Sequence, residues 1–407
     1  MNSIKTLLVL FLATIITIPS LCMAERSKVR YRGKTSVFVS YSNAQTNTDL
    51  SDSPMINLGF DNNGSPIPFI MDTGSCGIVA TPDKFQHAPD AVNLGTGVVH
   101  YTNGTFDKML TGTYWSATQQ IYSASGKLVA TSNVPVLQVT QESDNGGPPF
   151  TPSGFALMGV GFGREENSTP PKTPAYNPFL NLTSVLQRGK LRPLPKNWVN
   201  GYIISAQGAE LGLTARNTRK AGFIKLTYWE QYATSTLPEW MPMSMTVCAN
   251  GFCGDGMSVM DTGITGGILY LPGADLGTLV NCPNTTTPQC LPAGDVINVY
   301  YPNQTDPVAF YTFTVGQTGN PMQPDSVAEQ VRPTVYWNTS RHFLGGMNFV
   351  YDNKHGYAGF IWNGKTSDQY GYVIPTNHKY RHRHKHRSSS EQSSHKHGCE
   401  CESPVNL

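Results

Sequence analysis

The chain has 407 residues, a formal net charge of +2 and only 14% charged residues, with 39 glycines and 29 prolines. This length allows two ordinary domains with a sizeable core, and short alternating runs of Thr, Ser, Val and Tyr predict an all-β fold with tight turns. The charge divides into basic ends and an acidic body, which argues against nucleic acid as the main partner.

The first 24 residues have the pattern of a secretory signal peptide. Lys5 precedes an apolar stretch at residues 7–18, and residues 22–24 offer a cleavage site before Glu25. The stretch is short for a membrane span, and no second segment is long and apolar enough to cross a membrane. We therefore expect a secreted protein, extracellular or periplasmic, without an integral membrane span.

Residues 25–53 form a leader that is first basic and then polar. Two interpretations are open. The leader could be a short pro-segment whose Lys and Arg side chains block an acidic cleft, or it could be a plain exposed extension. The ordered body is expected to follow, from residue 54 to residue 375.

Two Asp-Thr-Gly triads stand 189 residues apart in this body, at residues 72–74 and 261–263. Each follows an apolar run that predicts a buried strand, and each half later has an apolar pair followed by Gly, at residues 157–159 and 343–345. One triad alone would be interpreted as a β-turn. Two copies in the same setting indicate a paired site.

This pattern resembles the pepsin-like aspartic protease family. The resemblance implies a bilobal all-β fold, with an N-terminal lobe over residues 54–195, a C-terminal lobe over residues 196–375 and a cleft between them. Residues 55–60 and 201–205 resemble two of the family's strands. A helix is predicted over about residues 177–187, because Pro lies near its start and Gly just beyond its end.

The resemblance implies that Asp72 and Asp261 are catalytic. Two adjacent carboxyl groups cannot both ionise cheaply, so they share one proton. The ionised group then activates a water molecule, and the protonated group donates to the developing oxyanion. No cofactor or metal is expected. The residues implied to support the pair are Thr73, Gly74, Ser75, Thr262 and Gly263.

The family also closes a β-hairpin flap, which usually carries a tyrosine, over its substrate. Tyr101 is the candidate here, because Asn103 and Gly104 could form the hairpin turn. Tyr114 and Tyr122 are alternatives.

Four residues depart from the family pattern. Ile264 follows the second triad where Ser or Thr is usual, so a hydroxyl contact to Asp261 is expected to be missing. Val79 stands in place of a Trp that supports the flap, and Gly346 in place of an Asp. Cys76 replaces Ser or Thr; it is interpreted as an inert buried side chain, or else as an oxidation-sensitive thiol. These departures would alter rate without removing either carboxyl group.

Seven cysteines remain after the signal peptide. The short-range pairs predict two disulfides in an oxidising compartment, Cys248 with Cys253 and Cys282 with Cys290. Residues 376–407 hold six of the ten histidines and are predicted to be a disordered, solvated tail, with weak metal or anionic-surface binding as the alternative.

The leading functional hypothesis is a secreted aspartic endopeptidase, active in acid, that takes an extended peptide or protein substrate. The main alternative is a catalytically weak or inactive protein of the same fold that acts as a binding or inhibitor module. A third hypothesis places the function in the His-rich tail. It predicts that deletion of the tail abolishes function while Asp72→Asn leaves it intact.

Overall fold

The computed structural model describes residues 31–60, 65–103, 106–164, 168–283, 288–364 and 368–376. The expected signal peptide lies outside the described residues, as does the expected tail from residue 377 onward. The predicted all-β class is confirmed. Within the described ranges the helices are single 3-10 turns, namely η2 (Pro174–Tyr176), η3 (Glu230–Tyr232), η4 (His342–Gly345) and η5 (Asp368–Tyr370).

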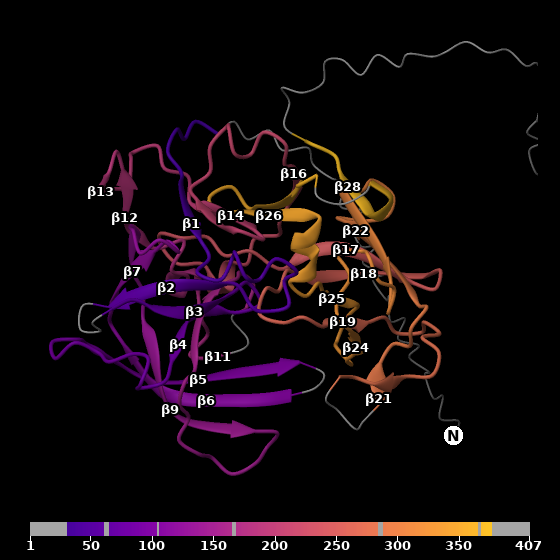
Figure 1. Cartoon of the computed structure of the whole chain (residues 1–407), viewed down its shortest axis with the longest axis horizontal. Coiled ribbons are helices and arrows are strands. Elements are labelled where there is room, and N and C mark those ends of the chain that lie inside the picture. The colour runs from indigo at the N-terminus through magenta and orange to yellow at the C-terminus, as the bar shows by residue number, and fades with distance from the viewer. Residues whose placement is uncertain are drawn as a thin grey trace, which may run out of the picture. The chain divides into compact units, whose positions relative to one another are not determined.

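A twelve-stranded sheet draws only on residues 55–193, and its strands run from indigo to magenta in Figure 1. In spatial order they are β11 (Ser168–Thr169), β5 (Asn93–Asn103), β6 (Phe106–Trp115), β9 (Val136–Asp144), β4 (Cys76–Ala80), β10 (Ala156–Val160), β3 (Ile67–Asp72), β2 (Met55–Phe60), β7 (Thr118–Tyr122), β8 (Leu128–Asn133), β12 (Leu182–Gln187) and β13 (Lys190–Pro193).

A ten-stranded sheet draws only on residues 243–373 and is mainly orange in Figure 1. Its strands in spatial order are β20 (Val280–Asn281), β21 (Pro288–Cys290), β24 (Val327–Glu329), β19 (Gly267–Tyr270), β25 (Tyr336–Asn338), β18 (Phe252–Val259), β17 (Met243–Ala249), β22 (Val296–Tyr301), β23 (Ala309–Thr314) and β28 (Gly371–Val373).

A six-stranded sheet joins segments from the beginning, middle and end of the described chain. Its strands in spatial order are β1 (Val37–Ser40), β15 (Gly208–Leu211), β14 (Gly201–Ser205), β26 (Met347–Asp352), β27 (Tyr357–Trp362) and β16 (Gly222–Lys225).

The burial of each strand follows its sequence pattern. In β23, buried residues alternate with half-buried ones, as expected when one face of a strand packs on the core. All five residues of β4 and all five of β10 are buried, because these central strands are covered on both faces. The strand that follows the first triad and the strand that pairs with it therefore lie in the interior.

The predicted helix over residues 177–187 is wrong. Residues 182–187 form β12, which pairs with β8 and with β13. Arg188 and Gly189 both have positive φ, 50° and 80°, and they form the two-residue hairpin turn between β12 and β13. Gly189 is thus a turn residue rather than the end of a helix.

Residues 31–53, expected to belong to the leader, are packed into the fold. β1 pairs with β15, and Tyr31, Tyr41 and Leu50 are buried. The Tyr31 hydroxyl donates to the buried carboxylate of Asp352 at 2.6 Å. A loss of residues 31–53 would therefore remove an edge strand and five core side chains, because Val37 and Val39 of β1 are buried as well.

Both predicted disulfides, Cys248–Cys253 and Cys282–Cys290, are present. The first closes the hairpin between β17 and β18, just before the second triad. No helix in the described part of the chain has the length and apolar character needed to cross a membrane.

Candidate active site

The first triad lies on the loop between β3 and β4. Asp72 is the last residue of β3 and is buried. Its Oδ1 accepts the Gly74 N–H at 2.6 Å, and its Oδ2 accepts the Ser75 hydroxyl at 2.6 Å. β10 pairs parallel with β3 and antiparallel with β4, so it lies between the strands that flank the loop. Both oxygens of Asp72 are thus held by the two residues that follow Thr73.

The second triad lies on a loop of the same design between β18 and β19. Here β25 pairs parallel with β18 and antiparallel with β19. Asp261 is buried, and its Oδ1 accepts the Gly263 N–H at 2.8 Å. In both loops, therefore, the N–H of the triad's own glycine holds one oxygen of the aspartate.

The two triad threonines connect the loops. The Thr73 N–H donates to Thr262 Oγ1 at 3.0 Å, and the Thr262 N–H donates to Thr73 Oγ1 at 3.1 Å. The Thr262 hydroxyl in turn donates to the main-chain oxygen of Met71 at 2.8 Å. This reciprocal and fully buried pair sets the spacing between the loops.

The triad glycines allow the carboxyl groups to approach each other. A Cβ atom on Gly74 would lie 2.4 Å from the Asp261 carboxyl group, and one on Gly263 would lie 2.8 Å from Asp72 Oδ1. Neither distance is compatible with a side chain. Each glycine therefore contacts the carboxyl group of the other triad, which places Asp72 and Asp261 face to face.

Asp72 is held in an environment that favours its protonated form. Burial, and secondly the charge of Asp261, raise the pKa of Asp72 to about 7, against the opposing effect of the hydrogen bonds from Ser75 and Gly74. The buried pair can therefore hold one shared proton throughout the acidic range.

Asn338 provides the second contact to Asp261, and the sequence does not single it out. Its Nδ2 donates to Asp261 Oδ2 at 2.6 Å, while its Oδ1 accepts the Ser340 N–H at 3.0 Å. The second bond fixes the amide so that its NH₂ group faces the carboxylate. The contact expected to be missing because of Ile264 is thus supplied by an amide from β25.

The second apolar–Gly element does not take the expected place. Residues 343–345 lie in η4, whereas the strand parallel to β18 is β25. The register sets Asn338 opposite Val259, as it sets Leu157 opposite Ile70. Asn338 is therefore the counterpart of Leu157. Because Asn338 is polar, a search of the sequence for a second apolar pair does not find this part of the repeat.

Arg341 lies behind the second triad with only 4% of its side chain exposed. Burial lowers its pKa, and the nearby carboxylates, Asp261 first, oppose that shift. Its guanidinium donates to four oxygens from two segments, Thr262 O, Gly263 O, Ser51 O and Ser53 Oγ, at 2.8–3.2 Å. The arginine thereby ties the triad loop to the chain just before β2.

A different buried cation, Lys172, lies near the first triad. Its side chain is 2% exposed, and its Nζ has no hydrogen-bond partner within the described ranges. Burial lowers the pKa of Lys172 to about 8, while Cys76 and Asp72 act in the opposite direction. Cys76 itself is buried, with Sγ 3.8 Å from the Thr173 main-chain oxygen, as expected for an enclosed side chain.

Tyr101 lies on the hairpin formed by β5 and β6, whose strands pair up to residues 103 and 106. Its ring is half-buried, and its hydroxyl is buried close to Ser75. Burial, followed by the charge of Asp72, raises the pKa of Tyr101, while Ser75 acts to lower it. The third strand, β9, pairs with β6 along its length, so the hairpin is backed by a further strand.

The alternative tyrosines do not line the cavity that contains the two aspartates. Tyr114 is buried against Tyr176, with ring centroids 5.3 Å apart, and contributes to a small core under the hairpin that includes Val79. The Tyr122 hydroxyl donates to Gln120 at 2.5 Å. Of the three tyrosines, Tyr101 lines the same cavity as the two aspartates.

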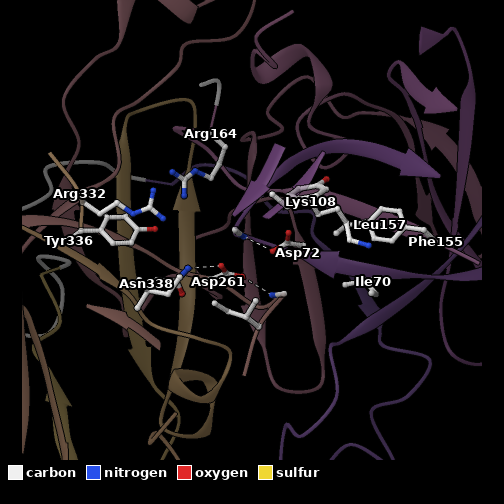
Figure 2. Close-up of a pocket in the computed structure, with 15 residues that line it drawn as sticks. Ile70, Asp72, Lys108, Phe155, Leu157, Arg164, Asp261, Arg332, Tyr336 and Asn338 are labelled. Atoms are coloured by element: carbon white, nitrogen blue, oxygen red, sulfur yellow. Dashed lines mark hydrogen bonds between the residues drawn. The ribbon is translucent and has the colours of Figure 1, made fainter. Parts of the chain in front are cut away.

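This cavity has a volume of about 260 Å³. Figure 2 shows Asp72 and Asp261 at its centre, with side chains from the twelve-stranded sheet on one side and from the ten-stranded sheet on the other. Its lining residues are Ile70, Asp72, Gly74, Tyr101, Lys108, Phe155, Leu157, Arg164, Asp261, Gly263, Ile264, Ile268, Arg332, Tyr336 and Asn338.

The described residues contain no group of three or more His, Cys, Asp or Glu side chains placed to hold a metal ion. The His-rich tail, for which weak metal binding is the alternative hypothesis, lies outside those residues. A scan against protein-family models and a search of curated proteins both find no match for the chain.

Proposed function

We propose that the protein is an aspartic endopeptidase of pepsin-like design. The observation that carries this proposal is the pair of buried carboxyl groups, Asp72 and Asp261, set face to face by two loops of the same construction at the centre of a cavity. Such a pair shares one proton and can act as acid and base on a single water molecule.

In the proposed reaction, Asp261 takes a proton from a water molecule that attacks the peptide carbonyl carbon. Asp72, whose pKa of about 7 keeps it protonated in acid, donates to the carbonyl oxygen as negative charge develops there. When the tetrahedral intermediate collapses and the C–N bond breaks, Asp261 gives the proton it took from water to the leaving nitrogen, and Asp72 takes a proton back from a hydroxyl of the intermediate. The hydrogen bonds from Gly263 and Asn338 suit a carboxylate at position 261.

The bilobal architecture belongs to this proposal. The twelve-stranded and ten-stranded sheets would be the cores of two lobes, with the six-stranded sheet joining them. The support is the repeated strand–loop–strand unit with a parallel third strand, β10 in one sheet and β25 in the other. The flap would be the hairpin of β5 and β6, with Tyr101 over the dyad. Secretion is also proposed, since disulfides are typical of oxidising compartments.

The alternative is a binding or inhibitor module of the same fold with little proteolysis. It is favoured by the second loop, where Ile264 lines the cavity in place of a hydroxyl-bearing residue. The Asn338 amide, which contacts Asp261 in place of that hydroxyl, could hold Asp261 for binding rather than for rapid proton transfer.

The test is cleavage of a mixed peptide library by the purified protein between about pH 3 and pH 7, with Asp72→Asn and Asp261→Asn as matched variants. The proposal predicts cleavage in acid that both substitutions abolish. Cleavage that survives either substitution would point to a contaminating or different activity. If the folded wild-type protein cleaves nothing, the binding alternative replaces the proposal.

A further inference from the structure

The cavity around the two aspartates has two unlike walls. Figure 2 shows Ile70, Phe155 and Leu157 on one side of the aspartates, and Arg164 and Arg332 with Tyr336 on the other. The first wall suits an apolar side chain, and Lys108 lies on the same side of the aspartates. The second wall carries two guanidinium groups. They lie beside the aspartate pair, which holds at most one negative charge when its two carboxyl groups share a proton.

Arg332 is positioned by its neighbours but is not neutralised by them. One guanidinium nitrogen, Nη2, donates to Gln330 Oε1 at 2.6 Å, and the guanidinium carbon lies 5.1 Å from the centre of the Tyr336 ring. Its Nε is buried and meets no acceptor in the described ranges. No described carboxylate lies within 4 Å of this side chain. Several N–H groups therefore remain for a ligand.

Arg164 approaches from the loop that follows β10. Its Nε donates to the main-chain oxygen of Gly163 at 3.0 Å, and no ion pair joins it to a described carboxylate. Lys108 offers a contrast within the same cavity, because it pairs with Glu142 and lies 3.7 Å from Asp144. Among the described residues, the unpaired positive charge of the cavity thus comes from the two arginines.

We infer that Arg164 and Arg332 form a carboxylate-binding subsite, which gives the protein a preference for peptides with an acidic residue on one side of the cleaved bond and an apolar residue on the other. This inference rests on the proposed peptidase function, since it names the substrate class of the same site. The planar guanidinium fork matches a carboxylate in two parallel hydrogen bonds, and partial burial strengthens these bonds. The carboxylate could be a Glu or Asp side chain or the C-terminus of a short peptide.

The test compares peptides that share an apolar residue and carry Glu, Gln or Lys at each position on both sides of the cleaved bond. Each peptide is prepared with a free and with an amidated C-terminus, and kcat/KM is measured near pH 5.5, where a Glu side chain is ionised. At one position the wild-type protein should prefer Glu over Gln by about 10-fold or more. Dependence on the free terminus alone would identify the C-terminal carboxylate as the ligand.

The variants Arg164→Gln and Arg332→Gln should each reduce the Glu preference, and the double variant should bring the Glu-to-Gln ratio to about 1 while it still cleaves the Gln peptide. The matched control is Arg192→Gln, an exposed arginine on β13, which should leave the ratio unchanged. Cleavage with no preference for Glu or a free terminus at any position would overturn the inference while leaving the proposed function intact.

A second measurement does not depend on turnover. Calorimetry with non-cleavable peptides, in which a hydroxyethylene group replaces the scissile bond, compares the affinities of the Glu and Gln forms. Tighter binding of the Glu form to the wild-type protein, lost in the double variant, supports the subsite even if no peptide is cleaved. Equal affinities of the Glu and Gln forms, with no difference between a free and an amidated C-terminus, would overturn it.

Discussion

The two triad loops share one backbone plan but hold their carboxyl groups through different side chains. Asp72 is bound by a hydroxyl from its own loop, Ser75, whereas Asp261 is bound by an amide from a neighbouring strand, Asn338. The cations behind them also differ, since Arg341 makes four hydrogen bonds and Lys172 makes none to a described residue. A repeated fold can thus place two identical groups in unlike surroundings, as acid–base chemistry requires.

The largest expected effect comes from crowding the contact between the loops. Gly74→Ala would place a Cβ atom 2.4 Å from the Asp261 carboxyl group and displace it from Asp72. We expect a loss of peptidase activity of about 1,000-fold or more, with the fold retained. Gly263→Ala, with its closest contact at 2.8 Å, should be less severe. Activity assays beside circular dichroism would check both, and an active Gly74→Ala protein would contradict the close approach.

The buried cations give the sharpest contrast in stability. Arg341→Met leaves carbonyl oxygens without donors and should lower the free energy of unfolding by roughly 2–4 kcal/mol. Lys172→Met removes a buried charge that has no hydrogen-bond partner among the described residues, and it should raise the free energy of unfolding by about 1–3 kcal/mol. Folding lowers the Lys172 pKa to about 8, so the wild-type protein loses stability as pH falls from about 10 to 8. The Lys172→Met gain should therefore be complete near pH 7, and denaturant titration would measure it. Equal effects of the two substitutions would refute the contrast.

The amide that replaces a hydroxyl can be tested directly. Asn338→Leu introduces the residue found at the counterpart position, Leu157, and removes the N–H that faces Asp261. We expect kcat to fall about 10- to 100-fold. Adding Ile264→Ser, which places a hydroxyl at the position equivalent to Ser75, should restore part of the loss. Unchanged kcat in Asn338→Leu would show that this contact does not serve catalysis.

The smallest expected effect is the pH dependence caused by Asp72. Folding raises its pKa from about 4 to about 7, so the folded state holds this proton more tightly than the unfolded chain does. The contribution to stability is therefore present in acid, is lost as pH rises from about 4 to 7 and then stays constant. Asp72→Asn should abolish this dependence and stabilise the protein at pH 7.5 by roughly 1–2 kcal/mol. Denaturant titrations at pH 4 and pH 7.5 would check the sign.

Sequence patterns predict the strands and the disulfides of this protein better than they predict the contacts around the second triad. The two triads, the strands at residues 55–60 and 201–205 and both cysteine pairs are local features, so short runs of sequence reveal them. Asn338 lies 77 residues from Asp261 along the chain and contacts it only because β25 pairs with β18, and no local pattern encodes that register.

The predicted helix over residues 177–187 fails for a related reason. Gly189 suits both a helix end and a hairpin turn, and the pairing of β12 with β8 and β13 decides between them. Lys172 and Arg341 are likewise ordinary surface residue types in the sequence, and only the tertiary packing buries them.

The account rests on one proton held by the buried pair, which Asp72 retains up to about pH 7. Nuclear magnetic resonance with ¹³C-labelled aspartate carboxyl groups, recorded from pH 4 to pH 8, measures it directly. We predict one aspartate that stays protonated to about pH 7 and whose signal disappears in Asp72→Asn. The absence of any such signal in the wild-type protein, or its loss in Asp261→Asn with retention in Asp72→Asn, would contradict the account.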